Sequence, residues 1–178
     1  MKFPGNTVQS SYASALGRII LAASGDHLVG LWFHDQRHLP DHSSWTQALA
    51  HPVLEKAKTQ LSDYFGGHRT CFDLPLNLGS GSDFQQAVWR ALLQIQPGTT
   101  TSYGALSLAL GNPKAVRAVA GAVARNPLSI VVPCHRVLGA QGDLTGYAGG
   151  LARKAALLQL EGAKFRIDPA STHPQRQL

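Results

Sequence analysis

One stretch of the sequence, residues 126–137, decides how the rest is organised: Asn126-Pro127-Leu128-Ser129-Ile130-Val131-Val132-Pro133-Cys134-His135-Arg136-Val137. Its apolar centre, residues 128–132, predicts a short buried strand. Cys134 follows where this strand ends, and Pro133 fixes the backbone before it. His135 and Arg136 would place positive charge beside the thiol, which would lower its pKa and favour the nucleophilic thiolate. A lone cysteine is more often a small buried hydrophobic residue, but one followed by histidine and arginine is not a typical core position.

A helix is expected downstream of the cysteine, from about residue 150 to Glu161. An acidic residue at the end of a helix opposes the helix dipole, so we expect Glu161 to hold another group. Cys134, His135 and Glu161 together would fit the nucleophile, base and orienting acid of thiol catalysis. The glycine-rich residues 145–150 would close over a planar ligand or form a tight turn.

Three helices are expected upstream of the cysteine. Asp83 would cap the first, over residues 84–95, and Ser102 would cap the second, over residues 103–110. A glycine and a proline then separate the second helix from the third, residues 113–125. Two helices joined by a short turn that contains glycine are typical of a helix-turn-helix.

The third of these helices has two different faces. Its periodicity predicts that Val116, Val119, Ala120 and Val123 pack inward. The opposite face is basic and sterically bare, which suits close approach to a DNA backbone or groove, although a solvated face of an alanine-rich helix is the alternative. It comprises Lys114, Arg117, Ala118, Gly121 and Arg125.

The first half of the chain predicts strands and one helix. Apolar runs at residues 17–23 and 28–33 read as a hairpin. Pro52 opens a helix that two glycines end after residue 65. Residues 71–76 are expected to form a third strand, with Cys71 as a buried hydrophobic residue.

A flexible stretch at residues 79–82 predicts a boundary between an N-terminal structural domain, 1–80, and a C-terminal domain, 81–178, whose polar tail, 168–178, is expected to fray. The net charge is +6. Residues 1–80 hold six basic and six acidic residues, so the excess lies in the second half. This asymmetry favours a polyanionic partner, most simply nucleic acid.

The composition of the 178 residues, 44% of them hydrophobic, excludes intrinsic disorder. Two cysteines do not make a disulfide scaffold. No long apolar run or signal peptide is found, so we expect a cytoplasmic protein that does not contact membranes. His34, His38 and His42 recur every four residues, but Pro40 argues against a helix there, and we expect no metal site.

The combination of motifs resembles the O6-alkylguanine-DNA alkyltransferases of the stand-alone bacterial type. The match covers about residues 82–162, with a further motif at residues 61–66. The matching stretches are Ser102-Tyr103-Gly104, residues 111–119, Asn126-Pro127, Pro133-Cys134-His135-Arg136-Val137, Gly146-Tyr147-Ala148-Gly149-Gly150 and Leu160-Glu161-Gly162.

This resemblance implies an α/β (α+β) fold. The N-terminal domain would be ribonuclease-H-like, with a small antiparallel sheet and a helix, and the C-terminal domain would be a mainly helical winged helix-turn-helix. The implied function is direct-reversal DNA repair, in which the alkyl group of O6-alkylguanine in a flipped-out base moves irreversibly to the Cys134 thiolate. O4-alkylthymine stays open as a second substrate. Each molecule would react once, with no cofactor.

Residue roles are also implied by the resemblance. Cys134 would attack the alkyl carbon, His135 would relay its proton through a water, and Glu161 would orient His135. Asn126 would brace the turn, and Tyr103 would rotate the phosphate and hydrogen-bond the guanine ring. Val137, Tyr147, Ala148 and Gly149 would line the substrate pocket.

The implied partner is double-stranded DNA that contains O6-alkylguanine. Arg117 would take the place of the flipped nucleotide, and the protein would act as a monomer, with cooperative binding left open. The further DNA contacts would be Lys114, Ala115, Val116, Ala118, Ala120, Arg125 and Tyr103. Val116 and Ala120 replace the Ala and Gly of some relatives, so the surface that faces the groove would differ slightly.

Three alternatives to this reading remain open. A lesion-binding alkyltransferase-like protein would bind damaged DNA without transfer, although such proteins lack the cysteine found here at position 134. A Cys-His thiol hydrolase would turn over repeatedly and would not need the basic helix. A plain helix-turn-helix module would bind DNA with an incidental thiol.

Overall fold

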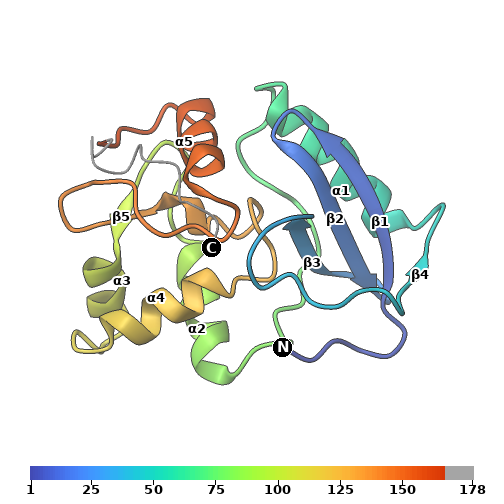
Figure 1. Ribbon diagram of the computed structural model, residues 1–178, viewed down its shortest axis with the longest axis horizontal. Helices are drawn as coiled ribbons and strands as arrows, with labels where there is room; N and C mark the ends of the chain where they lie inside the picture. Colours follow the sequence, from blue (N-terminus) through green and yellow to red (C-terminus); the bar gives the residue numbers. More distant parts are fainter. Residues whose placement is uncertain (167–178) are drawn as a thin grey trace, which may run out of the picture.

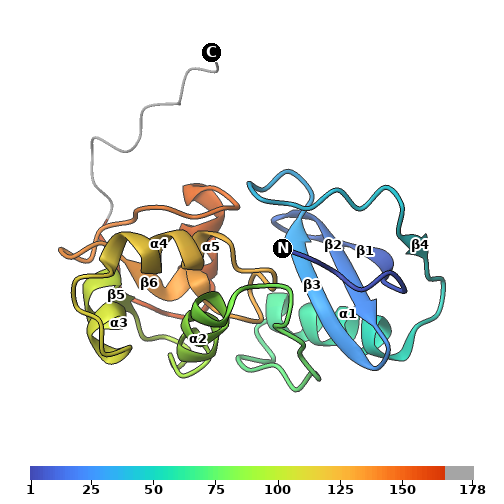
Figure 2. The ribbon, with the colours of Figure 1, turned by 90° about the horizontal axis from the view of Figure 1, so that it is seen from below.

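The computed structural model describes residues 1–166, so the expected fraying of residues 168–178 lies outside the described part. Figures 1 and 2 show the sheet and α1 on one side of the molecule and the other helices on the opposite side. The elements are, in chain order, β1 (Val8–Ser14), β2 (Gly17–Ser24), β3 (His27–Phe33), β4 (Thr46–Gln47), α1 (Pro52–Phe65), α2 (Asp83–Leu92), β5 (Thr101–Ser102), α3 (Tyr103–Ala109), α4 (Val116–Ala124), the 3-10 turn η1 (Cys134–Arg136), β6 (Val137–Leu138) and α5 (Leu151–Leu160). The predicted α/β class, with a sheet and helix first and mainly helices after, is confirmed.

The sheet has the order β3-β2-β1-β4, with β1, β2 and β3 antiparallel and β4 parallel to β1. The predicted hairpin of β2 and β3 is present, whereas β1 was not predicted because its sequence, VQSSYAS, is largely polar. The third strand predicted at residues 71–76 is wrong, and Cys71 is exposed. The side-chain amide of Gln60 satisfies both backbone groups of Asp73, at 2.8 and 2.9 Å, in place of a neighbouring strand.

Helix α1 has the predicted bounds, because Pro52 suits a first helical position and Gly67, at φ +74°, lies just beyond the C-cap. Helix α2 starts one residue earlier than predicted. Ser82, not Asp83, is its cap, and the Ser82 hydroxyl and the Gln85 side chain hydrogen-bond each other's backbone N–H. The helix also ends at Leu92, before the predicted residue 95.

Helix α3 begins as predicted, with the Ser102 hydroxyl accepting from the Ala105 N–H at 3.1 Å. Helix α4 starts three residues after Pro113, because the preceding residues form a turn in which the Ala115 N–H donates to the Asn112 carbonyl. The predicted inward face is partly wrong. Val119, Ala122 and Val123 are buried, but Val116 is 37% exposed and Ala120 is half-buried.

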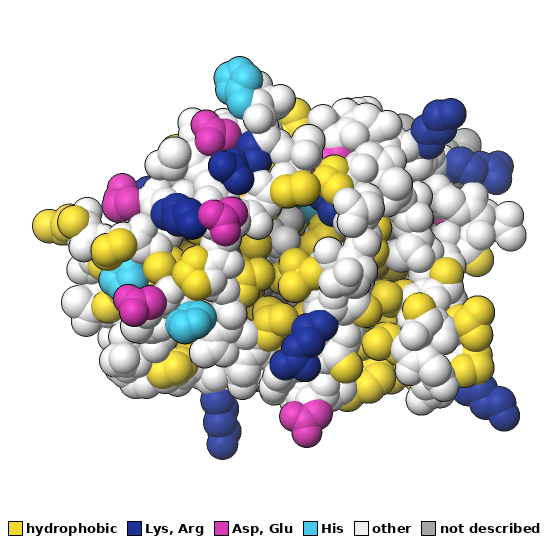
Figure 3. Space-filling view, turned by 180° about the vertical axis from the view of Figure 1, so that it is seen from behind, with side chains coloured by type: hydrophobic (Ala, Val, Ile, Leu, Met, Phe, Trp, Pro, Cys, Tyr) yellow, Lys and Arg dark blue, Asp and Glu magenta, His cyan; other side chains and the backbone are white. Residues whose placement is uncertain are grey.

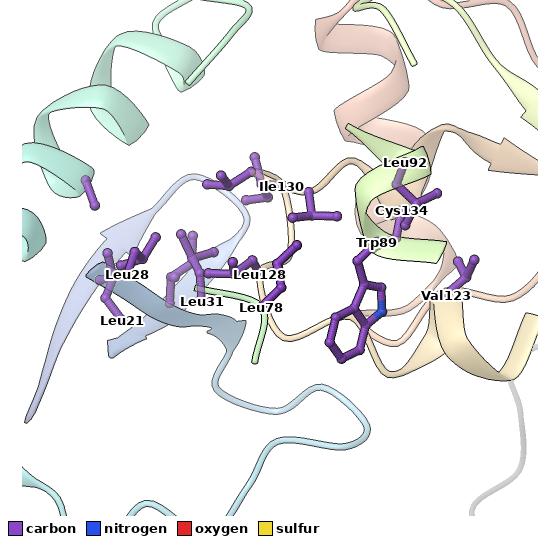
Figure 4. Packing of buried hydrophobic residues seen from close by; sticks show 14 of the residues in the cluster. Leu21, Leu28, Leu31, Leu78, Trp89, Leu92, Val123, Leu128, Ile130 and Cys134 are labelled. Atoms are coloured by element: carbon purple, nitrogen blue, oxygen red, sulfur yellow. The ribbon is translucent and has the colours of Figure 1, made fainter. Parts of the chain in front are cut away.

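One apolar core runs through both halves of the molecule (Figure 4). In that view Leu128 and Ile130 lie between sheet residues, such as Leu31, and Trp89 of α2. Residues 128–132 are buried as predicted but do not form a strand, since only Leu128 makes a bridge, to Leu31, and Ile130 has φ +72°. Backbone hydrogen bonds of 2.8 Å join Leu31 to Pro127 and to Ser129.

The face seen from behind has hydrophobic side chains gathered across its middle, with most charged side chains toward its margin (Figure 3). Within residues 1–166 no helix is long and apolar enough to cross a membrane. The same part of the chain contains no group of three or more His, Cys, Asp or Glu side chains that could hold a metal ion.

Candidate functional site

Cys134 opens the single turn η1, and its side chain is buried, at 4% exposure. Asn126 positions this turn. Its amide donates to Cys134 Sγ at 3.1 Å and to the Val132 carbonyl at 2.8 Å, while its oxygen accepts from the Leu128 N–H at 3.0 Å. The two ends of residues 128–132 are therefore held together by one buried side chain.

The environment of the thiol differs from the sequence-based prediction. Burial raises the pKa of Cys134, while the Asn126 hydrogen bond, the charge of Lys154 and backbone hydrogen bonds from Cys134 and His135 act to lower it. The expectation that the side-chain charges of His135 and Arg136 would lower it is wrong, because both side chains point to Glu161 instead. Neighbours in sequence are on different sides of a 3-10 turn, so adjacency along the chain does not bring their charges to the sulfur.

Glu161, the C-cap of α5, is the centre of a buried polar cluster, with a side chain only 1% exposed. Its Oε1 lies 2.9 Å from His135 Nε2, and Arg136 donates to both of its oxygens at 2.8 and 2.9 Å. Tyr64 of α1 also donates to Oε1, at 2.8 Å. Burial alone would raise the pKa of Glu161, but the hydrogen bonds and charges of His135 and Arg136 lower it to about 2.

His135 is fully buried, and burial lowers its pKa against the opposing effect of Glu161. A neutral imidazole that donates from Nε2 to Glu161 leaves the lone pair of Nδ1 free to accept a proton. Nδ1 has no hydrogen-bond partner within the described residues. The arrangement therefore suits a base held in one tautomer by a permanently ionised acid.

Lys154 is a functional candidate that sequence reasoning missed. It lies on α5, is completely buried, and donates to the carbonyl oxygens of Val137, Thr145 and Gly146. It makes no salt bridge to any carboxylate in the described chain, and burial lowers its pKa to about 8. The available signal was its position three residues from both Leu151 and Leu157 on the apolar face of a helix.

A cavity of about 380 Å³ opens between α3, α4 and residues 145–148. Tyr103 lies in its wall and donates to the Gly146 carbonyl at 3.2 Å. Burial, and then the charge of Cys134, raise the pKa of Tyr103 to about 12, so its hydroxyl stays a donor at neutral pH. Burial likewise raises the pKa of Tyr147, with a contribution from the charge of Cys134.

The structure brings half of the predicted DNA and pocket residues together around this cavity. Those in its lining are Tyr103, Val116, Arg117, Ala120, Tyr147 and Ala148, joined by Arg37 and His38 of the first half, which were not predicted. Others lie outside it: Lys114 and Ala118 are exposed, Ala115 is half-buried, and Arg125 lines a separate cavity beside Trp45. Val137 and Gly149 are also outside the lining, and their carbonyls accept from Lys154 and Arg153.

Comparisons with known proteins agree on one family. The model for the 6-O-methylguanine DNA methyltransferase ribonuclease-like domain matches residues 7–78, and that for the DNA binding domain matches residues 83–163. The methylated-DNA–protein-cysteine methyltransferase of Haemophilus influenzae is 43% identical over 151 residues, which is 84% of this chain and 83% of the relative. That of Mycobacterium bovis is 46% identical over 155 residues, or 87% and 92%. The crystal structure of Mycobacterium tuberculosis OGT in complex with DNA has a TM-score of 0.79 and 45% identity, covering 85% of this chain and 91% of that chain.

Proposed function

The chain belongs to the family of the methylated-DNA–protein-cysteine methyltransferases, and on that premise we propose that Cys134 is its alkyl acceptor. The protein binds DNA and repairs it by direct reversal, moving an alkyl group to one of its own cysteines. Of the two cysteines, Cys71 is exposed and Cys134 is buried beside the His135–Glu161 pair. That contact of His135 with Glu161, at 2.9 Å, is the observation that carries the proposal.

The proton of the thiol would leave through His135. At rest both groups are neutral, because burial raises the pKa of Cys134 and lowers that of His135. Nδ1 would accept the proton through one water, and Glu161 would stabilise the resulting imidazolium through Nε2. The charge of Lys154 and the Asn126 amide would stabilise the thiolate as it forms.

The transfer itself would be an in-line displacement at the alkyl carbon. A bond forms between Sγ of Cys134 and that carbon while the bond from carbon to O6 breaks, and the electron pair stays on the guanine. The proton that left the thiol ends on the base, so guanine departs neutral, helped by a hydrogen bond from Tyr103. The product is a thioether without an easy route to hydrolysis, which makes the reaction single-turnover and independent of a cofactor.

The cavity of about 380 Å³ would receive the flipped base. Tyr147, Ala148 and the carbonyl of Val137 would contact it, with the Ala148 N–H facing O6. Arg117, on the exposed face of α4, would fill the space left in the duplex. Phosphate contacts from this face would come from Lys114 and Arg125, beside the small residues Ala115, Val116, Ala118 and Ala120.

We also propose that the preferred partner is double-stranded DNA with O6-alkylguanine, and that the protein acts as a monomer in the cytoplasm. We further propose a division into two domains, residues 1–80 and 81–178. It is supported by the two family-model matches, which fall on either side of residues 79–82.

Mass spectrometry tests the acceptor directly. The protein is mixed with duplex DNA that contains one O6-methylguanine, and intact and peptide masses are measured. We expect one added methyl group, on the Cys134 peptide, stopping at one equivalent. Cys71→Ser is the matched control and should be methylated like the wild type, whereas Cys134→Ala should bind DNA without modification. Tight binding of the lesion by an unmodified wild type would contradict transfer, and repeated turnover would indicate a hydrolase.

Arg117→Ala separates base flipping from chemistry. We expect it to slow repair of a duplex lesion far more than reaction with free O6-benzylguanine, because the free base needs no extrusion. Lys114→Ala should instead weaken binding to all duplexes and reduce its salt dependence. Equal losses of both reactions in Arg117→Ala would exclude the proposed role.

A further inference from the structure

Arg153 directly precedes Lys154 in the sequence, but its side chain points in a different direction and contacts residues of the first half of the molecule. Its Nε donates to the Leu16 carbonyl at 2.8 Å, and its Nη1 and Nη2 lie 2.7 and 3.2 Å from the two carboxylate oxygens of Asp35. Nη1 also donates to the Gly149 carbonyl at 3.1 Å. One guanidinium therefore bridges β1–β2, the segment after β3, and the glycine-rich loop of the cavity.

The surroundings of this guanidinium fit it closely. It lies 4.4 Å from the centre of the Phe33 ring. Gly17 has φ +112°, which disfavours any other residue, and a Cβ there would lie in tight contact with Nη2, at 3.0 Å. A Cβ on Gly149 would lie 2.8 Å from Tyr147 and 3.0 Å from Phe33. The loop thus packs directly against the sheet at the point where Arg153 holds it.

The loop is held at both ends. Lys154 fixes its start through the carbonyls of Thr145 and Gly146, and Arg153 fixes its end through the carbonyl of Gly149. Between them the Arg37 N–H donates to the Ala148 carbonyl at 3.0 Å. Tyr147 and Ala148, which line the cavity, therefore take their backbone positions partly from residues of the first half.

We infer that Arg153 is a positioning residue for base capture, through which the N-terminal half sets the backbone of residues 147–149. This rests on the proposed function, in which that backbone contacts the flipped base. Asp35 is 51% exposed, and exposed ion pairs contribute little to stability, so the contact to Gly149 and the geometry it imposes are the main contribution. The expected effect is on the affinity for the base more than on stability or on the reactivity of the thiol.

Single-turnover reaction with free O6-benzylguanine measures this effect, since its concentration dependence separates the apparent dissociation constant from the limiting rate. For Arg153→Met we expect the dissociation constant to rise about tenfold, as for loss of one charge-assisted hydrogen bond, with a limiting rate close to that of the wild type. Asp35→Asn should give a smaller rise, and Arg153→Lys should restore part of the affinity. Lys56→Met is the matched control, because it removes an exposed ion pair, with Asp73, that lies entirely within the first half. It should change neither the dissociation constant nor the limiting rate.

Amide hydrogen exchange gives a readout that does not need the reaction. Arg153→Met should speed exchange in residues 146–150 of the free protein, and Lys56→Met should not. An Arg153→Met protein with a lowered unfolding temperature but unchanged exchange and unchanged dissociation constant would show a merely structural role and overturn the inference. A wild type that leaves Cys134 unmodified would refute the proposed function instead, and the exchange experiment would still decide whether Arg153 positions the loop.

Discussion

Two buried side chains of opposite charge belong to the reactive site, and their surroundings differ. Glu161 is surrounded by His135, Arg136 and Tyr64, so a full positive charge faces it. Lys154 faces only three backbone carbonyls. A carboxylate that is paired with a guanidinium keeps its charge, whereas an ammonium that is hydrogen-bonded only to backbone carbonyls does not keep it as firmly.

The pKa values express this difference. That of Glu161 is lowered to about 2, so the acid is ionised at neutral pH. That of Lys154 is lowered to about 8, so its charge is close to the point of loss. Glu161, which orients His135, therefore keeps its charge. Lys154, which holds the loop at Thr145 and Gly146, can lose its charge as the pH rises.

Glu161→Gln should have the largest effect, because it leaves the buried Arg136 without a compensating charge. We expect the free energy of unfolding to fall by about 3–5 kcal/mol and alkyl transfer to slow by at least about a hundredfold. Urea unfolding and single-turnover transfer measure the two. Glu161→Asp keeps the charge and should keep more of both, and Glu55→Gln, on the surface of α1, is the control. Unchanged stability in Glu161→Gln would show that the ion pair is not the main interaction.

Lys154→Met should lower the stability less than Glu161→Gln does. Removing a buried charge that has no salt bridge partly offsets the loss of its hydrogen bonds. We expect the free energy of unfolding to fall by about 1–3 kcal/mol, from three carbonyls left without a donor. Transfer should slow by about tenfold, since the thiolate loses a nearby charge and the loop loses its anchor. A loss of stability as great as that of Glu161→Gln would remove the contrast between the two charges.

The two charges should also act in separate pH ranges. The pKa of Glu161 is below its usual 4.5, so its stabilisation is present above that pH and is lost as the pH falls toward 2. The pKa of Lys154 is below its usual 10.5, so the folded state releases this proton first, and stability should rise from pH 8 to 10.5. Each contribution is at most about 3 kcal/mol, converted from the shift.

Variants assign each pH range to its residue. Unfolding curves of Glu161→Gln should lack part of the acid-side loss, and those of Lys154→Met should lack the alkaline rise. An alkaline rise that persists in Lys154→Met would belong to another group and would contradict the assignment.

Tyr64→Phe should have the smallest effect, because Oε1 of Glu161 keeps its bonds to His135 and Arg136. We expect the free energy of unfolding to fall by about 1 kcal/mol and transfer to slow by no more than about threefold. Thermal unfolding and single-turnover rates check this. Tyr12→Phe, at a half-buried tyrosine of β1, is the control. A loss of stability as large as that of Glu161→Gln would mean that the hydrogen bond from Tyr64, in the first half, is the main interaction of the Glu161 carboxylate.

The elements with strong local signals could be predicted from the sequence. Pro52 and the glycines after residue 65 gave the bounds of α1, and Ser102 gave the start of α3. Residues 128–132 were recognised as buried but not in their conformation, because an apolar run does not reveal that Ile130 adopts φ +72°. Strand β1 was missed, since its partner rather than its own composition makes it a strand.

The residue types of the candidate site were predicted from the sequence, whereas the contacts of Glu161 with His135 and of Asn126 with the turn were expected only through the family resemblance. Cys134, His135, Asn126 and Glu161 do come together, yet the meeting of His135 with a residue 26 positions away depends on how α5 packs. Lys154 and Tyr64 could not be assigned, because a buried lysine and a helix tyrosine look ordinary until their partners are known. Their partners lie on other elements, and long-range packing is the feature that is hardest to predict from a single sequence.

The unbroken core of Figure 4 also determines how the molecule comes apart. Because residues 128–132 pack between the sheet and α2, neither half can melt without exposing the interior of the other to water. Heat or urea should therefore meet a single cooperative unit. A cavity made in β2, for example by Leu21→Ala, would then raise the fraction of molecules in which Cys134 is open to solvent, so that the chemical lifetime of an unused thiol depends on the packing of a distant sheet.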